Sequence, residues 1–133
     1  MKKLSVALLP LTLILVLAAA GCGKPVGGTQ TPSTGGGNVV SMTADNFVQH
    51  SITVKAGSSV EFQDPADTGG THILCLGKAQ SCVANAQGPA ELNTSSGVQF
   101  NAGDSKSYVF ATPGTYTVTC TIHANMDVTV TVQ

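Results

Sequence analysis

Alternating apolar and polar residues form the main pattern from residue 39 to the C-terminus. The runs from Tyr116 to Cys120 and from Val128 to Val132 place an apolar side chain at every second position, with Thr between them. A period of two predicts β-strands with one buried face, and no stretch keeps the period of 3.6 that a helix requires. The strands expected from this pattern are Val39–Thr43, Ser51–Lys55, Ser59–Gln63, His72–Leu76, Val98–Asn101, Lys106–Phe110, Gly114–Thr121 and Asp127–Val132.

Residues that favour turns separate these strands. The breaks fall at Ala56-Gly57, Thr68-Gly69-Gly70, Ala102-Gly103-Asp104 and Thr112-Pro113-Gly114. About eight short strands in about 95 residues predict an all-β fold, a sandwich of two antiparallel sheets with the core between them. If Tyr116 and Val118 face that core, Cys120 faces it too, at the end of its strand.

The first residues of the chain have a different character. Lysines at positions 2 and 3 precede an apolar run that ends in Ala19-Ala20-Gly21-Cys22, which predicts an export signal over residues 1–21. The apolar run of roughly 14 residues is shorter than the roughly 20 that a membrane-spanning helix needs. The Ala-Ala-Gly-Cys ending resembles the lipobox of bacterial lipoproteins, which implies a lipid on Cys22. The alternative is an ordinary signal peptide that is cut nearby.

A linker follows the signal. Residues 23–38 consist largely of Gly, Thr, Pro and Ser without hydrophobic periodicity, and they predict a flexible tether. Such a tether spans roughly 20 to 25 Å. We therefore expect a lipidated Cys22 with a linker over residues 22–38 and one folded domain over residues 39–133. The domain would be held at the outer face of a bacterial membrane, in the periplasm or on the cell surface.

Charge and composition exclude some partners. Loss of Lys2 and Lys3 with the signal changes the formal charge from −1 to −3, and the chain contains no Arg and no Trp. Phosphate neutralisation and base stacking both lack the residues they need, so nucleic acid is not expected as a partner.

The chain has four cysteines, Cys22, Cys75, Cys82 and Cys120. Exported proteins meet oxidising conditions, so their cysteines usually pair or carry a specific role. If Cys22 carries a lipid, Cys75 and Cys82 are the pair closest in sequence, and a disulfide between them leaves Cys120 free. The alternatives for these residues are an inert buried thiol at Cys120 and a structural zinc site made by Cys75, Cys82, Cys120 and His123.

Cys120, His123 and Met126 are spaced three residues apart at the junction of the last two strands. Blue-copper electron-transfer sites combine two histidines and a thiolate with a weak axial methionine. Cu(I) prefers soft ligands and low coordination whereas Cu(II) prefers nitrogen, so a fixed intermediate cage suits both ions. The sequence therefore predicts one copper ion as the cofactor.

A second histidine must complete this set, and His50 and His72 are available. Both lie next to expected strands, so spacing alone does not choose between them. His72 follows Gly69-Gly70-Thr71, a flexible approach to the rim of a sandwich, and is modestly favoured for that reason.

The stretch from Ala111 to Met126 resembles the copper-site segment of the cupredoxins, the plastocyanin- and amicyanin-like type 1 blue copper proteins. Its Pro-Gly-x-Tyr-x-x-x-Cys strand runs into Cys-x2-His-x2-Met, a spacing similar to the short ligand loop of amicyanin. The segment from Ala56 to Phe62 is similar to the family's Ala-Gly-x-x-Val-x-Phe pattern. This resemblance implies a Greek-key β-sandwich and the copper ligands His72, Cys120, His123 and Met126.

Two features depart from the family pattern. Many cupredoxins have asparagine after the first histidine ligand, and its side chain ties the two ligand loops together. Here that residue is Ile73, so the tie must be replaced or absent. The segment from Cys75 to Leu92 also has the character of an insertion near the site.

The function expected from these features is one-electron transfer by a membrane-tethered copper protein. Its partners would be a redox protein donor and acceptor, without a small-molecule substrate, and we expect a monomer. With three histidines and no His-x-His pair, the chain has room for one such centre, which argues against a multicopper enzyme. The alternatives are an extracytoplasmic copper chaperone or scavenger and a metal-free binding module.

Overall fold

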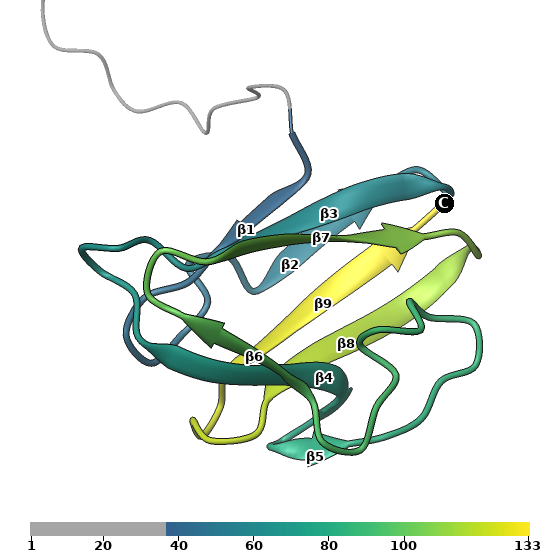
Figure 1. Cartoon of the computed structure of the whole chain (residues 1–133). Helices are drawn as coiled ribbons and strands as arrows, with labels where there is room; N and C mark the ends of the chain where they lie inside the picture. The colour runs from purple at the N-terminus through teal and green to yellow at the C-terminus, as the bar shows by residue number, and fades with distance from the viewer. Residues whose placement is uncertain (1–36) are drawn as a thin grey trace, which may run out of the picture. The chain divides into compact units, whose positions relative to one another are not determined.

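The computed structural model describes residues 37–133, which form two layers of β-strands (Figure 1). The expected export signal, the lipid on Cys22 and nearly all of the linker lie outside these residues. Within residues 37–133 no helix has the length and apolar character needed to cross a membrane.

Nine strands make up the two sheets. The three-stranded sheet has the order β1 (Val39–Ser41), β3 (Ser58–Gln63) and β7 (Ser105–Phe110). The six-stranded sheet has the order β2 (Ser51–Val54), β9 (Asp127–Val132), β8 (Gly114–Cys120), β4 (Thr71–Lys78) and β5 (Ser81–Cys82), and β6 (Val98–Asn101) pairs with β4. Every expected strand is present with its ends shifted by at most two residues, and β5 is additional.

The all-β sandwich is confirmed, but its sheets are not purely antiparallel. β1 pairs with β3 in parallel, and so does β2 with β9. Neither pair is joined by a hairpin, because the chain crosses to the other sheet between β1, β2 and β3. Only strands connected by a tight turn are obliged to run in opposite directions.

The core lies between the inner faces of the two sheets. Phe62 of β3 packs edge-on against Tyr108 of β7, and Phe110 meets Tyr116 of β8 across the sandwich at 5.4 Å between ring centroids. Tyr116 also donates its phenol hydrogen to the carbonyl of Thr112 at 2.7 Å, which fixes the connection between β7 and β8. The Phe110–Tyr116 pair joins the two layers at the end of β8 opposite Cys120.

β4 has two halves that serve different purposes. Its first half pairs with β6, and its second half pairs with β8 from Leu74 opposite Cys120 to Leu76 opposite Val118. His72 therefore lies two residues beyond the point where β8 ends, and it is on the same inward parity as Leu74 and Leu76. Beyond Leu76, β4 leaves β8 and turns into a short hairpin with β5.

Candidate metal centre

Cys120 ends β8 with its thiol directed into the sandwich. Tyr116, Val118 and Cys120 are all buried, as the alternation in the sequence predicts. Among residues 37–133 this is the free cysteine, because Cys75 and Cys82 form a disulfide. The zinc site considered from the sequence is therefore wrong, because two of its three sulfurs are bonded to each other.

The ligand loop, residues 120–126, is short and closed by its own backbone. The amide of Cys120 donates to the carbonyl of Met126 at 3.0 Å, and the amide of Thr121 donates to the carbonyl of Ile73 at 2.9 Å. Asn125 adopts a left-handed backbone with φ of 63°, a conformation that asparagine tolerates better than most residues. The loop thus returns the chain sharply into β9 and brings its side chains close to β4.

Three ligand atoms converge at this rim. The Nδ1 atoms of His72 and His123 lie 3.2 Å apart, and Cys120 Sγ lies 3.9 Å from the first and 3.6 Å from the second. Metal bonds of about 2.0 Å to nitrogen and about 2.3 Å to sulfur span a triangle of this size. The three residues form a group whose ligand atoms all lie within 4.8 Å of one another.

The remaining candidate ligands, Met126 and His50, differ in burial and in their position relative to the cluster. Met126 is fully buried, and its backbone is hydrogen-bonded to that of Cys120 at the base of the triangle. His50 is exposed, and it is not part of the cluster. The structure thus places His72, rather than His50, opposite the ligand loop.

Asp64 is a buried residue next to the site that the sequence interpretation missed. Its Oδ1 lies 3.8 Å from His72 Nε2, and the two side chains are completely buried. The distance is too long for a hydrogen bond, but both Asp64 Oδ2 and His72 Nε2 lack another partner within residues 37–133. The carboxylate therefore favours a proton on Nε2 and leaves Nδ1 free to bind a metal.

The loop around Asp64 is built to hold that carboxylate in place. The amide of Gly70 donates to Asp64 Oδ1 at 3.0 Å, and the backbone of Asp64 is hydrogen-bonded to Gly103 and Asp104. A Cβ on Gly69 would overlap the same Oδ1 atom, so this close approach requires glycine. The sequence carried a weak signal for this residue, because Asp64 lies five residues before the Gly69-Gly70 pair and eight residues before the candidate ligand His72.

Electrostatics at His72 favour the neutral ring. Burial lowers the pKa of His72 below its ordinary value, and this effect outweighs the opposing attraction of Asp64. A neutral imidazole is the form that binds a metal.

Residues 35–133 match the family of copper binding proteins that comprises plastocyanin and azurin. Because the match covers most of the chain, the protein belongs to this family, whose members are the cupredoxins. Copper is accordingly the metal of this site, and the family supports a blue copper electron carrier.

Solved structures agree on the fold. A reduced form of an amicyanin mutant shares 23% identity and a TM-score of 0.54, covering 77% of this chain and 87% of that one. Amicyanin from Paracoccus versutus shares 20% identity and a TM-score of 0.53, covering 77% and 85%. A reduced Cu(I) form of another amicyanin mutant at pH 4 shares 22% identity and a TM-score of 0.56. No curated protein sequence matches the chain significantly.

The donor set fits copper. Two imidazole nitrogens and a thiol converge, with His72 and Cys120 buried and His123 partly buried, and a buried methionine at position 126 is bonded through its backbone to Cys120. This is the combination of soft and nitrogen ligands that defines a type 1 copper site.

Proposed function

We propose that this protein is a membrane-tethered, extracytoplasmic blue copper protein that carries single electrons between redox proteins. The observation that carries the proposal is the convergence of His72 Nδ1, His123 Nδ1 and Cys120 Sγ within 4.8 Å in a cupredoxin sandwich. Copper bound there supplies the Cu(I)/Cu(II) couple. Met126 would provide the weak axial thioether.

The ligands have unequal access to solvent, and this suggests the route of the electron. His72 is completely buried, whereas His123 is only partly buried on the loop. Since Nδ1 of His123 faces the cluster, its other ring edge is directed away from the ligands. Ile122 is 46% exposed and Ala124 is also exposed, so exposed apolar side chains flank His123 in the loop. We infer that a redox partner docks there.

The cellular setting of the proposal rests on the N-terminal sequence. The export signal over residues 1–21, the lipid on Cys22 and the Gly- and Thr-rich linker would hold a monomeric domain at the outer face of the bacterial membrane. Mass spectrometry of the mature N-terminus tests this part. A free, unmodified Cys22 would exclude the anchor.

Enclosure of the ligands favours a carrier over a copper chaperone. Trafficking sites more often use several methionines in an open geometry, whereas Met42 and Met126 are both buried in the core here. A carrier requires ligands that keep their positions in both oxidation states.

An optical spectrum with Cu(II) added to the full chain tests the function directly. We expect an intense blue colour at one copper per chain and reversible voltammetry with copper retained over many cycles. A colourless copper complex would rule out the proposal. Rapid loss of Cu(I) to a chelator would instead indicate copper handling.

A further inference from the structure

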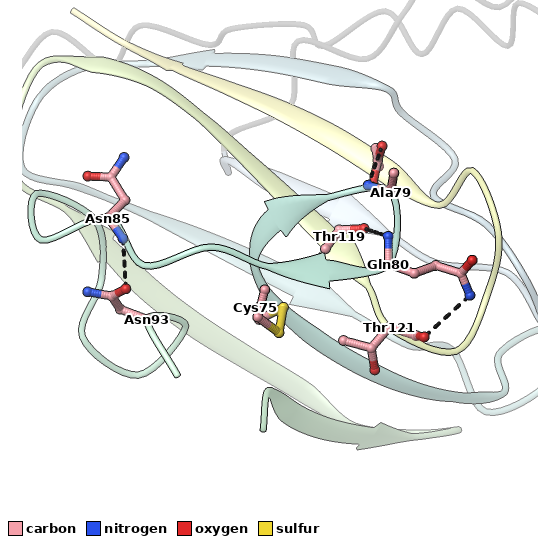
Figure 2. Close-up of a disulfide and its surroundings, with 9 residues drawn as sticks. Cys75, Ala79, Gln80, Asn85, Asn93, Thr119 and Thr121 are labelled. Carbon is pink, nitrogen blue, oxygen red and sulfur yellow. Dashed lines mark hydrogen bonds between the residues drawn. A yellow bond between two sulfur atoms is a disulfide. The ribbon is translucent and has the colours of Figure 1, made fainter. Parts of the chain in front are cut away.

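The tip of the β4–β5 hairpin lies against the base of the ligand loop (Figure 2). The amide of Ala79 faces both carboxylate oxygens of Asp127 at 3.3 Å, and the amide of Gln80 donates to Thr119 Oγ1 at 3.1 Å. The side-chain amide of Gln80 donates to the carbonyl of Thr121 at 3.3 Å. Thr119 directly precedes residues 120–126, Thr121 lies in their first turn, and Asp127 directly follows them. The tip of the hairpin therefore contacts the chain at both ends of the ligand loop.

Thr119 shows how closely the hairpin covers this part of β8. It lies between the inward-facing Val118 and Cys120, so its side chain belongs to the outer face of the sheet. Threonines on the outer face of a sheet are normally exposed to solvent, yet Thr119 is completely buried. Its hydroxyl accepts the hydrogen bond from Gln80.

The backbone of the tip is unusual for its residues. Ala79 and Gln80 have φ of 51° and 65°, the left-handed region on both central positions of a two-residue turn. Such turns strongly favour Asn-Gly or Gly-Gly, and other residues persist there only when surrounding contacts fix them. The hydrogen bond from the Gln80 side chain to Thr121 is such a contact, and it accounts for a glutamine at the second position of the turn.

A disulfide and a close backbone contact also restrain the hairpin. Cys75, opposite Thr119 in the sheet, is joined to Cys82 by the disulfide. Gly77 pairs with Cys82, and a Cβ on Gly77 would overlap the carbonyl oxygen of Ser81. The covalent link and this tight pairing leave the tip little freedom to move away from the loop.

We propose that Gln80 is a positioning residue for the copper ligand loop, held in place by the Cys75–Cys82 hairpin. It fixes the carbonyl of Thr121, the residue between the thiol ligand and the rest of the loop, and so restrains the path to His123. The purpose of this restraint, holding a copper site, rests on the proposed function, whereas the contacts themselves are observed in the structure.

Amide hydrogen exchange in the copper-free full chain tests the proposal. Gln80→Gly suits the left-handed turn and removes only the side-chain bond, while Gln87→Ala removes an exposed glutamine from the same segment as a matched control. Loss of one hydrogen bond should speed exchange of the Cys120 and Thr121 amides on the order of threefold to tenfold. Exchange at Val130 in β9 should stay unchanged, and Gln87→Ala should resemble the wild type.

Two results would overturn this role. One is unchanged exchange at Cys120 and Thr121 in Gln80→Gly. The other is an equal increase at Val130, because that would mean a general loss of stability rather than a local release.

A second measurement uses the copper-loaded chain. Transfer of copper to EDTA should accelerate in Gln80→Gly by a similar factor, and more strongly in Cys75→Ala/Cys82→Ala, with Gln87→Ala unchanged. Equal transfer rates in all variants would contradict the proposal. If the wild type does not turn blue with copper, the proposed function fails, but the exchange experiment still decides the role of Gln80.

Discussion

Two short turns meet at the base of the copper site. One supplies ligands, and the other restrains them. The ligand loop, residues 120–126, carries three of the four expected ligands and is closed by one backbone hydrogen bond of its own. Residues 77–82, the hairpin of β5 with the end of β4, carry no ligand. They are hydrogen-bonded to Thr121 in the loop and to Thr119 and Asp127 directly beside it, and the hairpin is closed by a disulfide. Donor chemistry and rigidity thus come from different parts of the chain.

This division suits an electron carrier. Donor atoms must be of specific types, so the loop has little choice of residues at three positions. The restraint on those donors needs only well-placed polar groups, so it can come from any neighbouring segment. Mutations in the loop should therefore change the identity of the metal site, and mutations in the hairpin should change its stability and kinetics.

The largest effect is expected for Cys120→Ser. The thiolate provides the covalent bond to copper that gives type 1 sites their colour, so the variant should lose the intense blue band completely. The absorption spectrum of the copper-loaded chain measures this. Retention of the blue band would contradict the assignment of Cys120 as a ligand.

Removal of the disulfide is the matching change on the hairpin. Cys75→Ala/Cys82→Ala opens a short covalent loop and should lower the free energy of unfolding by about 2 to 3 kcal/mol. Denaturant unfolding of the copper-free chain measures that loss. The blue colour should persist, since neither cysteine lies among the converging ligand atoms. A colourless double variant would break the distinction between the two turns.

Asp64→Asn weakens the support on the opposite side of the site. Loss of the charge that faces His72 Nε2 should reduce copper affinity by about 10- to 100-fold, the usual cost of changing a group behind a ligand. Competition with a chelator measures the affinity. Asp67→Asn, a change of the same kind at an exposed position of the same loop, is the control and should bind copper normally.

Sequence alone predicted the ligand loop well because its information is local. The strand parity of Cys120, the spacing to His123 and Met126 and the turn between them all lie within one short stretch. Strand positions followed for the same reason, since period-two alternation is a local property. The Gly-Gly pair before His72 favoured it only modestly over His50, and the resemblance to the cupredoxins was needed to assign it.

The supports were missed because they are side-chain contacts made from loops and turns, which a strand pattern does not predict. Asp64 approaches His72 across a loop, and Gln80 reaches Thr121 from a distant part of the chain. No periodicity marks either residue. The sequence did raise the question of what replaces the asparagine expected at Ile73, and the segment judged to be an insertion supplies a tie to the ligand loop. The parallel strand pairs were also beyond local patterns, because pairing direction depends on how the chain crosses between sheets.

The smallest expected effect concerns pH and the copper-free chain. Burial lowers the pKa of His72 below its ordinary value of 6.5, so the unfolded chain takes up this proton more readily than the folded chain. Unfolding therefore becomes easier as pH falls below 6.5, until the folded chain is protonated as well. The slope from this residue is at most about 1.4 kcal/mol per pH unit, the value for one proton.

Comparison with His72→Gln isolates the contribution of this residue. Free energies of unfolding are measured with copper removed at several pH values between neutrality and mild acid. As pH falls, the free energy of unfolding of the wild type should decrease relative to that of His72→Gln, since only the wild type buries an ionisable ring at this position. A difference that stays constant would mean that the folded chain accepts the proton as readily as the unfolded one. In that case the attraction of Asp64 would fully offset the effect of burial on the pKa of His72, and a difference that moves in favour of the wild type would mean that Asp64 outweighs burial.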